Sequence, residues 1–79
     1  MAHFSTLYRK AIRQQQLGLS DEDMQILRLI ANRATNDEIG GAINWSRASV
    51  KRHVQRIFEK LGVASRPQAA AEAVCRGLI

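Results

Sequence analysis

The sequence predicts an all-α domain of four helices, preceded by a leader that can form a further helix. Three segments begin with a hydroxyl residue followed three positions later by an acid or an amide, as capping boxes do at helix starts. Glycine follows the third and fourth helical patterns, where a left-handed residue commonly ends a helix. No segment is typical of a strand. The chain of 79 residues is shorter than an average domain, so we expect one domain with a modest core.

The leader, residues 1–18, has apolar residues at helical spacing: Phe4, Leu7, Tyr8, Ala11 and Ile12. It ends at Gly18, and two interpretations stay open. The leader is either an extra helix that lies on the domain or on a partner, or a partly ordered tag or linker remnant, because chain termini commonly fray. Residues 19–79 form the predicted domain.

Four helices are expected in the domain, at residues 21–33, 36–43, 47–61 and 66–77. Their predicted N-terminal caps are Ser20 with Asp23, Thr35 with Glu38, Ser46 alone, and Ser65 with Gln68. The third and fourth helices are expected to end at Gly62 and Gly77, because glycine adopts the left-handed conformation without strain.

The corner between the second and third expected helices is very short. Only Asn44 and Trp45 precede the cap Ser46, and asparagine tolerates a positive φ better than most residues. Gly40 falls where the next helix should cross closely, since a residue without Cβ lets two backbones approach. We expect Trp45 to fill the corner. This pattern predicts a helix-turn-helix.

Residues 47–61, RASVKRHVQRIFEKL, have two contrasting faces on a helical wheel. One face carries the apolar stripe Val50, Val54, Ile57, Phe58 and Leu61. The opposite face carries Arg52, Gln55, Arg56 and Glu59, with Ser49 and Lys51 on its flanks. The first face is expected to join the core, and the second is free to meet a ligand.

The basic face has two interpretations. Surface helices often carry Lys and Arg only for solubility, but such faces usually interleave acids with bases. Residues 46–79 hold seven Lys and Arg against Glu59 and Glu72, and the whole chain has a net charge of +5. Guanidinium groups can bond guanine and carboxamides can bond adenine, so a helix of this kind suits the major groove of DNA. The charge pattern favours nucleic acid.

Nothing in the sequence predicts an enzyme, a metal site or a cofactor. Cys75 is the single cysteine, so no intramolecular disulfide and no cysteine-based metal spacing exist. His53 has no nucleophile or carboxylate at activating spacing and is expected to pack or to support a phosphate contact; His3 has no assigned role. The acidic run at residues 21–23 suits a helix N-terminus without a metal.

No apolar run approaches the roughly 20 residues that span a bilayer, and no secretory signal is present. A membrane partner is therefore not expected, nor is a small-molecule ligand of this chain. A reduced, cytoplasmic setting is the simplest expectation for a chain with one cysteine.

Three segments of the domain, TNDEI, SVKRHVQRIFEKLGV and the closing GLI, together resemble the LuxR-type (GerE-like) helix-turn-helix DNA-binding family. The resemblance runs from Leu19 to Ile79. It implies a bacterial transcription regulator whose third helix enters the major groove of double-stranded promoter DNA and whose fourth helix pairs two protomers. It also implies a location on the bacterial nucleoid, with RNA polymerase as a further candidate partner.

The resemblance also implies roles for individual residues. Base-reading positions fall on Lys51, Arg52 and Gln55, with Arg56 as a further candidate. Phosphate contacts fall around Thr35, Asn36, Ser46, Ser49 and Lys60, and Arg47 joins them from its position near the start of the basic helix.

The sequence departs from the family pattern at five positions. The family usually has Arg at Glu22, Gly at Arg33, Lys at Asp37, Ala at Gly40 and an aliphatic residue at Trp45. Glu22 and Asp37 remove positive charge near the expected phosphate contacts, which lowers the expected contribution of the first two domain helices to DNA affinity.

The last expected helix, within PQAAAEAVCRGLI, is small and apolar on nearly all sides. Such a helix has more apolar perimeter than one core can cover, so we expect a homodimer. The predicted interface residues are Ala70, Ala71, Val74, Cys75 and Leu78. The alternative is a short terminal helix that only completes the core.

A second functional class stays open beside the DNA-binding regulator. The chain could be a truncated regulator that acts as a protein-interaction module, pairing with a full-length partner and titrating it. Asp37 and Glu22 favour this alternative, because both disfavour phosphate. Whether the chain is a stand-alone regulator or a fragment is also open.

Overall fold

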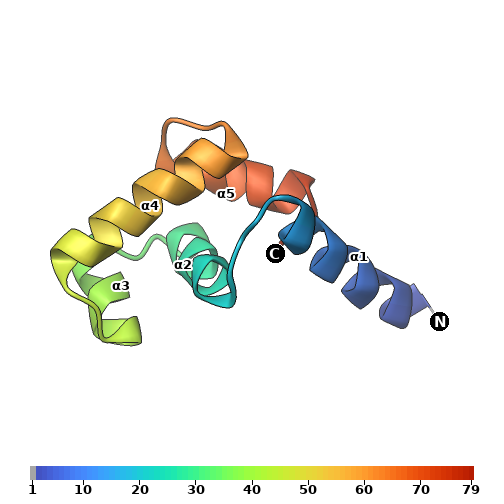
Figure 1. The fold of residues 1–79 in the computed structure, drawn as a ribbon, viewed down its shortest axis with the longest axis horizontal. Helices are drawn as coiled ribbons and strands as arrows, with labels where there is room; N and C mark the ends of the chain where they lie inside the picture. Colours follow the sequence, from blue (N-terminus) through green and yellow to red (C-terminus); the bar gives the residue numbers. More distant parts are fainter. Residues whose placement is uncertain (1) are drawn as a thin grey trace.

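The computed structural model describes residues 2–79, with side chains described from Arg9 onward. This part of the chain is entirely helical, without strands (Figure 1). The helices are α1 (Ala2–Gln16), α2 (Asp21–Ala31), α3 (Asn36–Ile43), α4 (Arg47–Leu61) and α5 (Arg66–Cys75). The predicted all-α domain of four helices is confirmed, and the leader forms the additional helix α1.

Two helices end earlier than predicted, and the backbone explains both differences. After α2, Arg33 has a φ of 63°, so it lies in the left-handed region and cannot continue the helix. Gly77 has a φ of 69° and stops α5 in the same manner. The predicted ends at residues 33 and 77 are therefore the left-handed residues beyond each helix.

The helix starts follow the predicted capping chemistry with one exception. The two complete capping boxes are Ser20 with Asp23 and Thr35 with Glu38. Before α5, the Ser65 hydroxyl accepts from the Gln68 backbone amide at 3.3 Å, as a plain N-cap does. The Gln68 side chain accepts from the Ala64 amide instead, so this third predicted box is incomplete.

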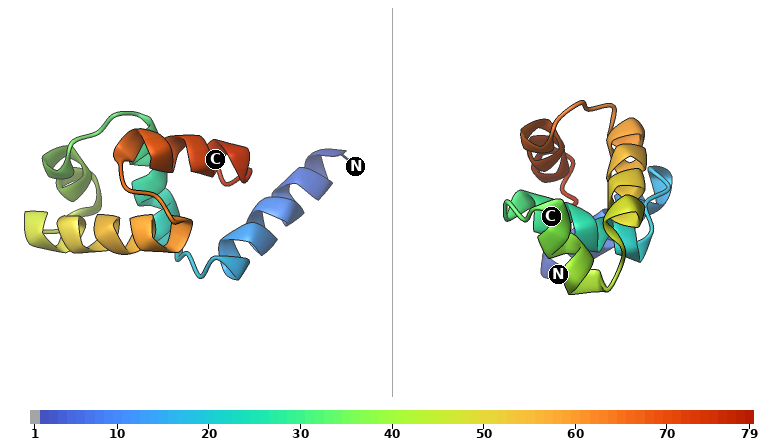
Figure 2. Two further views of the ribbon diagram at one scale, coloured as in Figure 1. Left: turned by 90° about the horizontal axis from the view of Figure 1, so that it is seen from above. Right: turned by 90° about the vertical axis from the view of Figure 1, so that its left-hand side faces the viewer.

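The core lies where α2 packs against α4 and α5, with α3 held against α4 (Figure 2). Its fully buried side chains include Ile26, Leu27, Ile39, Val50 and Ile57. Each of the four domain helices contributes at least one buried apolar side chain, so the predicted apolar stripe of residues 50–61 is used inside the protomer.

The corner between α3 and α4 is closed by tight backbone contacts. Asn44 adopts the left-handed conformation with a φ of 59°, in agreement with its predicted tolerance. A Cβ at Gly40 would lie 2.7 Å from the Trp45 carbonyl oxygen. The same Cβ would lie 3.6 Å from a Val50 side-chain atom of α4, which is an ordinary contact. Gly40 is therefore required by the backbone of the corner and not by the approach of α4. Trp45 is half-buried and packs against the core.

Helix α1 extends away from the four-helix body (Figures 1 and 2). Its C-terminal end is attached: Arg13 donates to the Arg76 carbonyl, and Gln14 Nε2 donates to Asp21 Oδ1 at 2.9 Å. The structure describes side chains only from Arg9 onward, so the predicted apolar positions Phe4, Leu7 and Tyr8 lie outside the described part. No helix within residues 2–79 combines the length and the apolar character needed to cross a bilayer.

Candidate nucleic-acid interface

Helix α4 presents one face to the core and the other to solvent. Val50 and Ile57 are completely buried, whereas Lys51, Arg52, Gln55 and Arg56 are all exposed. The predicted division of this helix into an apolar and a polar face is confirmed. The four expected base-reading side chains thus lie on the solvent side of α4.

Three exposed cations of α4 have no ion-pair partner within residues 9–79. Within residues 9–79, the ion pairs are Arg47 with Asp37, Lys60 with Asp23 and Arg76 with Glu72. Lys51, Arg52 and Arg56 take part in none of them. Because a salt-bridged cation has less to gain from a second anion, these three cations are the ones best able to bind an anionic partner.

Two helix N-termini lie on either side of the corner, and hydroxyl residues cap both. The Thr35 hydroxyl accepts from the Glu38 amide at 3.1 Å, and the Ser46 hydroxyl accepts from the Ser49 amide at 3.2 Å. The Ser46 hydroxyl also donates to Ser49 Oγ at 3.0 Å. The Thr35 backbone amide hydrogen-bonds the Glu38 carboxylate and lowers its pKa.

Arg47 and Asp37 join the first turns of α4 and α3 through two hydrogen bonds. Arg47 Nε donates to Asp37 Oδ1 at 2.7 Å, and Arg47 Nη2 donates to Asp37 Oδ2 at 2.5 Å. These bonds lower the pKa of Asp37 and raise the pKa of Arg47. Both side chains are exposed, at 72% for Arg47 and 63% for Asp37. The expected phosphate contact Arg47 is therefore already paired with a carboxylate.

Lys60 lies at the other end of α4 and turns into the fold. Its ammonium donates to the Gly18 carbonyl at 2.6 Å and lies 3.5 Å from Asp23 Oδ2. The Lys60 side chain is 28% exposed. Its expected contact with DNA phosphate stays a prediction, and that contact would compete with these two internal acceptors.

His53 packs beneath the corner. Its Nδ1 lies 2.7 Å from the Ser49 carbonyl oxygen, which can only accept, so Nδ1 carries the proton. The imidazole centroid lies 4.3 Å from the Trp45 ring, with the planes tilted by 45°. His53 thus holds the tryptophan against α4, in agreement with its predicted packing role.

The exposed side of α5 carries most of the predicted dimer residues. Ala71, Val74 and Cys75 are exposed, with Val74 at 62%, and Ala70 is half-buried. Leu78 differs from the prediction, because it is only 2% exposed and lies in the core of the protomer. The left-handed Gly77 turns the chain inward after α5 and directs Leu78 away from that surface.

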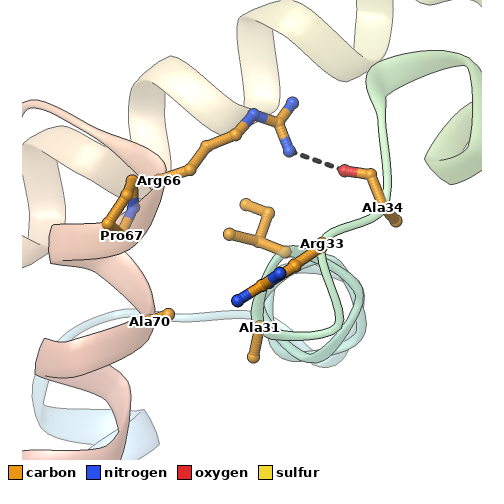
Figure 3. A pocket seen from close by; sticks show the side chains of 7 residues that line it. Ala31, Arg33, Ala34, Arg66, Pro67 and Ala70 are labelled. Atoms are coloured by element: carbon orange, nitrogen blue, oxygen red, sulfur yellow. Dashed lines mark hydrogen bonds between the residues drawn. The ribbon is translucent and has the colours of Figure 1, made fainter.

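A pocket of about 630 Å³ separates the end of α2 from the start of α5 (Figure 3). Arg33 and Arg66 both border it, together with apolar side chains. Arg66 donates to the Ala34 carbonyl at 2.9 Å and to the Asn36 side chain. Arg66 therefore fastens α5 to the turn before α3. Its bond to Asn36, an expected phosphate contact, uses the amide oxygen and not the side-chain NH2 that could donate to a phosphate.

Sequence reasoning missed three of these contacts: Asp37 with Arg47, Lys60 with Asp23, and Arg66 with Asn36. The first had a signal, since opposite charges stand ten residues apart on either side of a tight corner. Within residues 9–79, no group of three or more His, Cys, Asp or Glu residues is arranged to hold a metal ion.

The tight corner, the short helix α3 and the exposed basic face of α4 define a helix-turn-helix domain of the DNA-binding class. Comparison with protein families agrees with this class. The family described as bacterial regulatory proteins, luxR family (GerE), matches residues 17–73. The chain belongs to the LuxR family of bacterial regulatory proteins.

Several curated relatives share the name HTH-type transcriptional regulator MalT. Those of Yersinia enterocolitica and Serratia proteamaculans are each 34% identical to the chain over 55 residues, which is 70% of this chain. The MalT of Cronobacter sakazakii has the same identity over the same length. The matched segment spans only 6% of each of these relatives, so the similarity concerns this domain and not their remaining length.

Proposed function

We propose that the chain regulates transcription by binding double-stranded DNA in a sequence-specific manner, with α4 in the major groove. The observation that carries this proposal is the exposed face of α4. Lys51, Arg52 and Arg56 are free of internal ion pairs among the described side chains, and Gln55 stands between them. Cations supply affinity for phosphate, and Arg and Gln side chains distinguish bases.

The four side chains have different roles in this proposal. Arg52 and Arg56 are one helical turn apart and can each bond guanine bidentately, while Gln55 can bond adenine. Lys51 bonds a base or neutralises a phosphate. Because an α-helix fits the major groove, one solvent-facing side of α4 can reach the edges of consecutive base pairs.

Phosphate contacts are proposed on either side of the corner. The N-termini of α3 and α4 carry partial positive charge and amides suited to an anion. Thr35 and Ser46 are exposed there, next to Asn36 and Ser49. Such contacts fix how the domain lies on the duplex without distinguishing bases.

A homodimer through α5 completes the proposal. A single small module covers only about 600–1,000 Å² on DNA, whereas a two-fold pair contacts two half-sites. The exposed Val74 supports pairing, with Ala70, Ala71 and Cys75 around it. Small side chains allow two helices to approach closely.

The function is tested by fluorescence anisotropy of a labelled duplex of random sequence, titrated with the chain at about 50 and 200 mM salt. We expect binding that weakens steeply with salt, with a log–log slope of about −0.9 for each phosphate contacted. Selection from a random duplex pool should then return a two-fold symmetric site.

Failure to bind any duplex at the lower salt contradicts the proposal. It would favour the second class, an interaction module that pairs with a full-length regulator. The exposed Val74 supports that alternative, because it offers an apolar contact to a partner. The pairing of Arg47 with Asp37 also supports it, because it leaves one cation fewer for DNA.

A further inference from the structure

The pair between Asp37 and Arg47 has a property that the other ion pairs of the domain lack. It joins the two helices of the helix-turn-helix, and it lies at the first turn of each. Arg47 is the first residue of α4, and the N-terminal residues of a recognition helix are those that normally approach DNA most closely. The pair thus lies at the proposed contact surface.

The ion pair occupies the side-on edge of the Arg47 guanidinium. Both oxygens of Asp37 accept, one from Nε and the other from Nη2, so the edge that can bind a phosphate bidentately from the side is taken. A phosphate that binds Arg47 in this manner must first displace the carboxylate. The Asp37 carboxylate is ionised at neutral pH, and its hydrogen bond with Arg47 lowers its pKa further.

We propose that Asp37 is an affinity-limiting residue, which competes with DNA phosphate for Arg47 and sets the domain to bind DNA weakly. The inference rests on the proposed function and names a regulatory residue of that same surface. Asp37 lowers the affinity for DNA in two ways. The carboxylate occupies the guanidinium, and its own negative charge repels the phosphate backbone.

The exposure of both side chains fits a competitor better than a structural clamp. Exposed ion pairs add little to folding, because water and salt screen them and ordering two side chains costs entropy. The carboxylate can therefore be exchanged for a phosphate without loss of the fold. Two weakly binding protomers then need to act together on one site, which makes binding depend on pairing.

The test is a double-mutant cycle on random-sequence duplex, with Asp37→Asn, Arg47→Met and the double variant. We expect Asp37→Asn to bind about 3- to 10-fold more tightly at 0.1 M salt, with a salt slope steeper by about 0.9, the value of one added phosphate contact. In the Arg47→Met background, the same substitution should lose most of this gain, because no guanidinium is left to release.

Asp21→Asn is the matched control. Asp21 is also an exposed aspartate in the first turn of a helix, and it accepts a hydrogen bond from Gln14 rather than from Arg47. This control reports the general effect of one removed negative charge. Melting curves followed by circular dichroism should place each single variant within about 4 °C of the wild type.

Each outcome has a distinct meaning. The inference fails if Asp37→Asn binds no better than Asp21→Asn, or if its gain is the same with and without Arg47. It also fails if Asp37→Asn binds more weakly than the wild type, because the carboxylate then orients Arg47 for DNA. Absence of DNA binding by the wild type and by every variant contradicts the proposed function, and the inference falls with it.

Discussion

Lys60 Nζ lies 3.5 Å from the Oδ2 of Asp23, a carboxylate that is completely buried at the start of α2. The same ammonium donates to the Gly18 carbonyl at 2.6 Å. Asp23 Oδ2 also accepts from the Ser20 amide, whereas its Oδ1 has no hydrogen-bond partner among the described residues. Lys60 is thus the cation that compensates a buried charge, and it holds the end of α4 against the segment that follows α1.

Removal of this ammonium should destabilise the domain. Lys60→Met leaves the Asp23 carboxylate buried without its cation, so we expect a loss of about 2 kcal/mol in the free energy of unfolding, below the roughly 3–5 kcal/mol of a fully buried pair. Urea denaturation measures this change in the free energy of unfolding. Lys51→Met is the control, because Lys51 is exposed and its change in stability should stay within about 0.5 kcal/mol.

The same two variants separate the roles of the lysines on DNA. Lys51→Met should weaken DNA binding and reduce its salt slope by about 0.9, whereas Lys60→Met should reduce the slope by less, because its ammonium already has two internal acceptors. An equal reduction by both variants would show that Lys60 leaves these acceptors for a phosphate.

Gln55→Ala should relax base preference. If Gln55 bonds adenine bidentately, its removal should lower the ratio of selected-site to random-duplex affinity by about tenfold, since such a pair contributes roughly 1–3 kcal/mol of discrimination. Competition anisotropy with both duplexes measures the ratio. Gln25→Ala, an exposed glutamine on α2, should leave it unchanged. Equal losses on both duplexes would contradict the base-reading role.

Val74→Asp should prevent pairing through α5. Val74 is 62% exposed, so the substitution leaves the protomer core intact while placing a charge in the proposed interface. Sedimentation velocity should find a monomer, and affinity for a two-half-site duplex should fall steeply. Gln25→Asp gives the same charge change on α2 and should behave as the wild type. A wild type that is monomeric even on a two-half-site duplex would overturn the dimer.

Gly40→Ala and Gly41→Ala should change stability in opposite directions. At Gly40 the added Cβ would meet the Trp45 carbonyl oxygen at 2.7 Å, so the corner must shift, at a net cost of about 1 kcal/mol. At Gly41 no atom lies within 4 Å, and alanine should stabilise the helix by about 1 kcal/mol. Thermal melting compares the two variants. Equal stabilisation by both would show that the Trp45 backbone moves away from the added Cβ without cost.

Arg33→Gly should stabilise the domain. Arg33 has a φ of 63°, a conformation that costs a side chain about 1–2 kcal/mol, and glycine relieves this strain at some cost in unfolded-state entropy. We expect a net gain of about 0.5 kcal/mol by urea denaturation. Arg28→Gly, at an exposed position in the last turn of α2, should lose up to about 1 kcal/mol. A loss at Arg33 would indicate that its side chain stabilises the pocket that it borders.

The fold was largely predictable from the sequence because its signals are local. Ser20, Thr35 and Ser46 cap helices through partners three residues away, and Gly62 and Asn44 end them with a left-handed backbone. The apolar stripe of α4 follows from helical period alone. These features depend on a few consecutive residues, so they can be predicted before the tertiary structure is known.

The interface was less predictable because its side chains are distributed by contacts distant in sequence. Lys60 and Gly18 are 42 residues apart, and Arg66 and Asn36 are 30 apart. The family resemblance assigns Lys60 to phosphate, and its position near the helix start adds Arg47, yet each side chain has an internal acceptor that neither argument contains. Leu78 was misplaced because it was assigned to the same surface as Val74, although the left-handed Gly77 between them turns the backbone.

Trp45 is the single tryptophan of the chain, and its ring lies against His53, with the planes tilted by 45°, at the corner between α3 and α4. Its emission therefore arises from one place only. Selective excitation of tryptophan monitors the corner without an added label, because the emission of an indole depends on the polarity of its surroundings. The domain thus carries its own optical probe at the junction where α3 and α4 must keep their relative orientation.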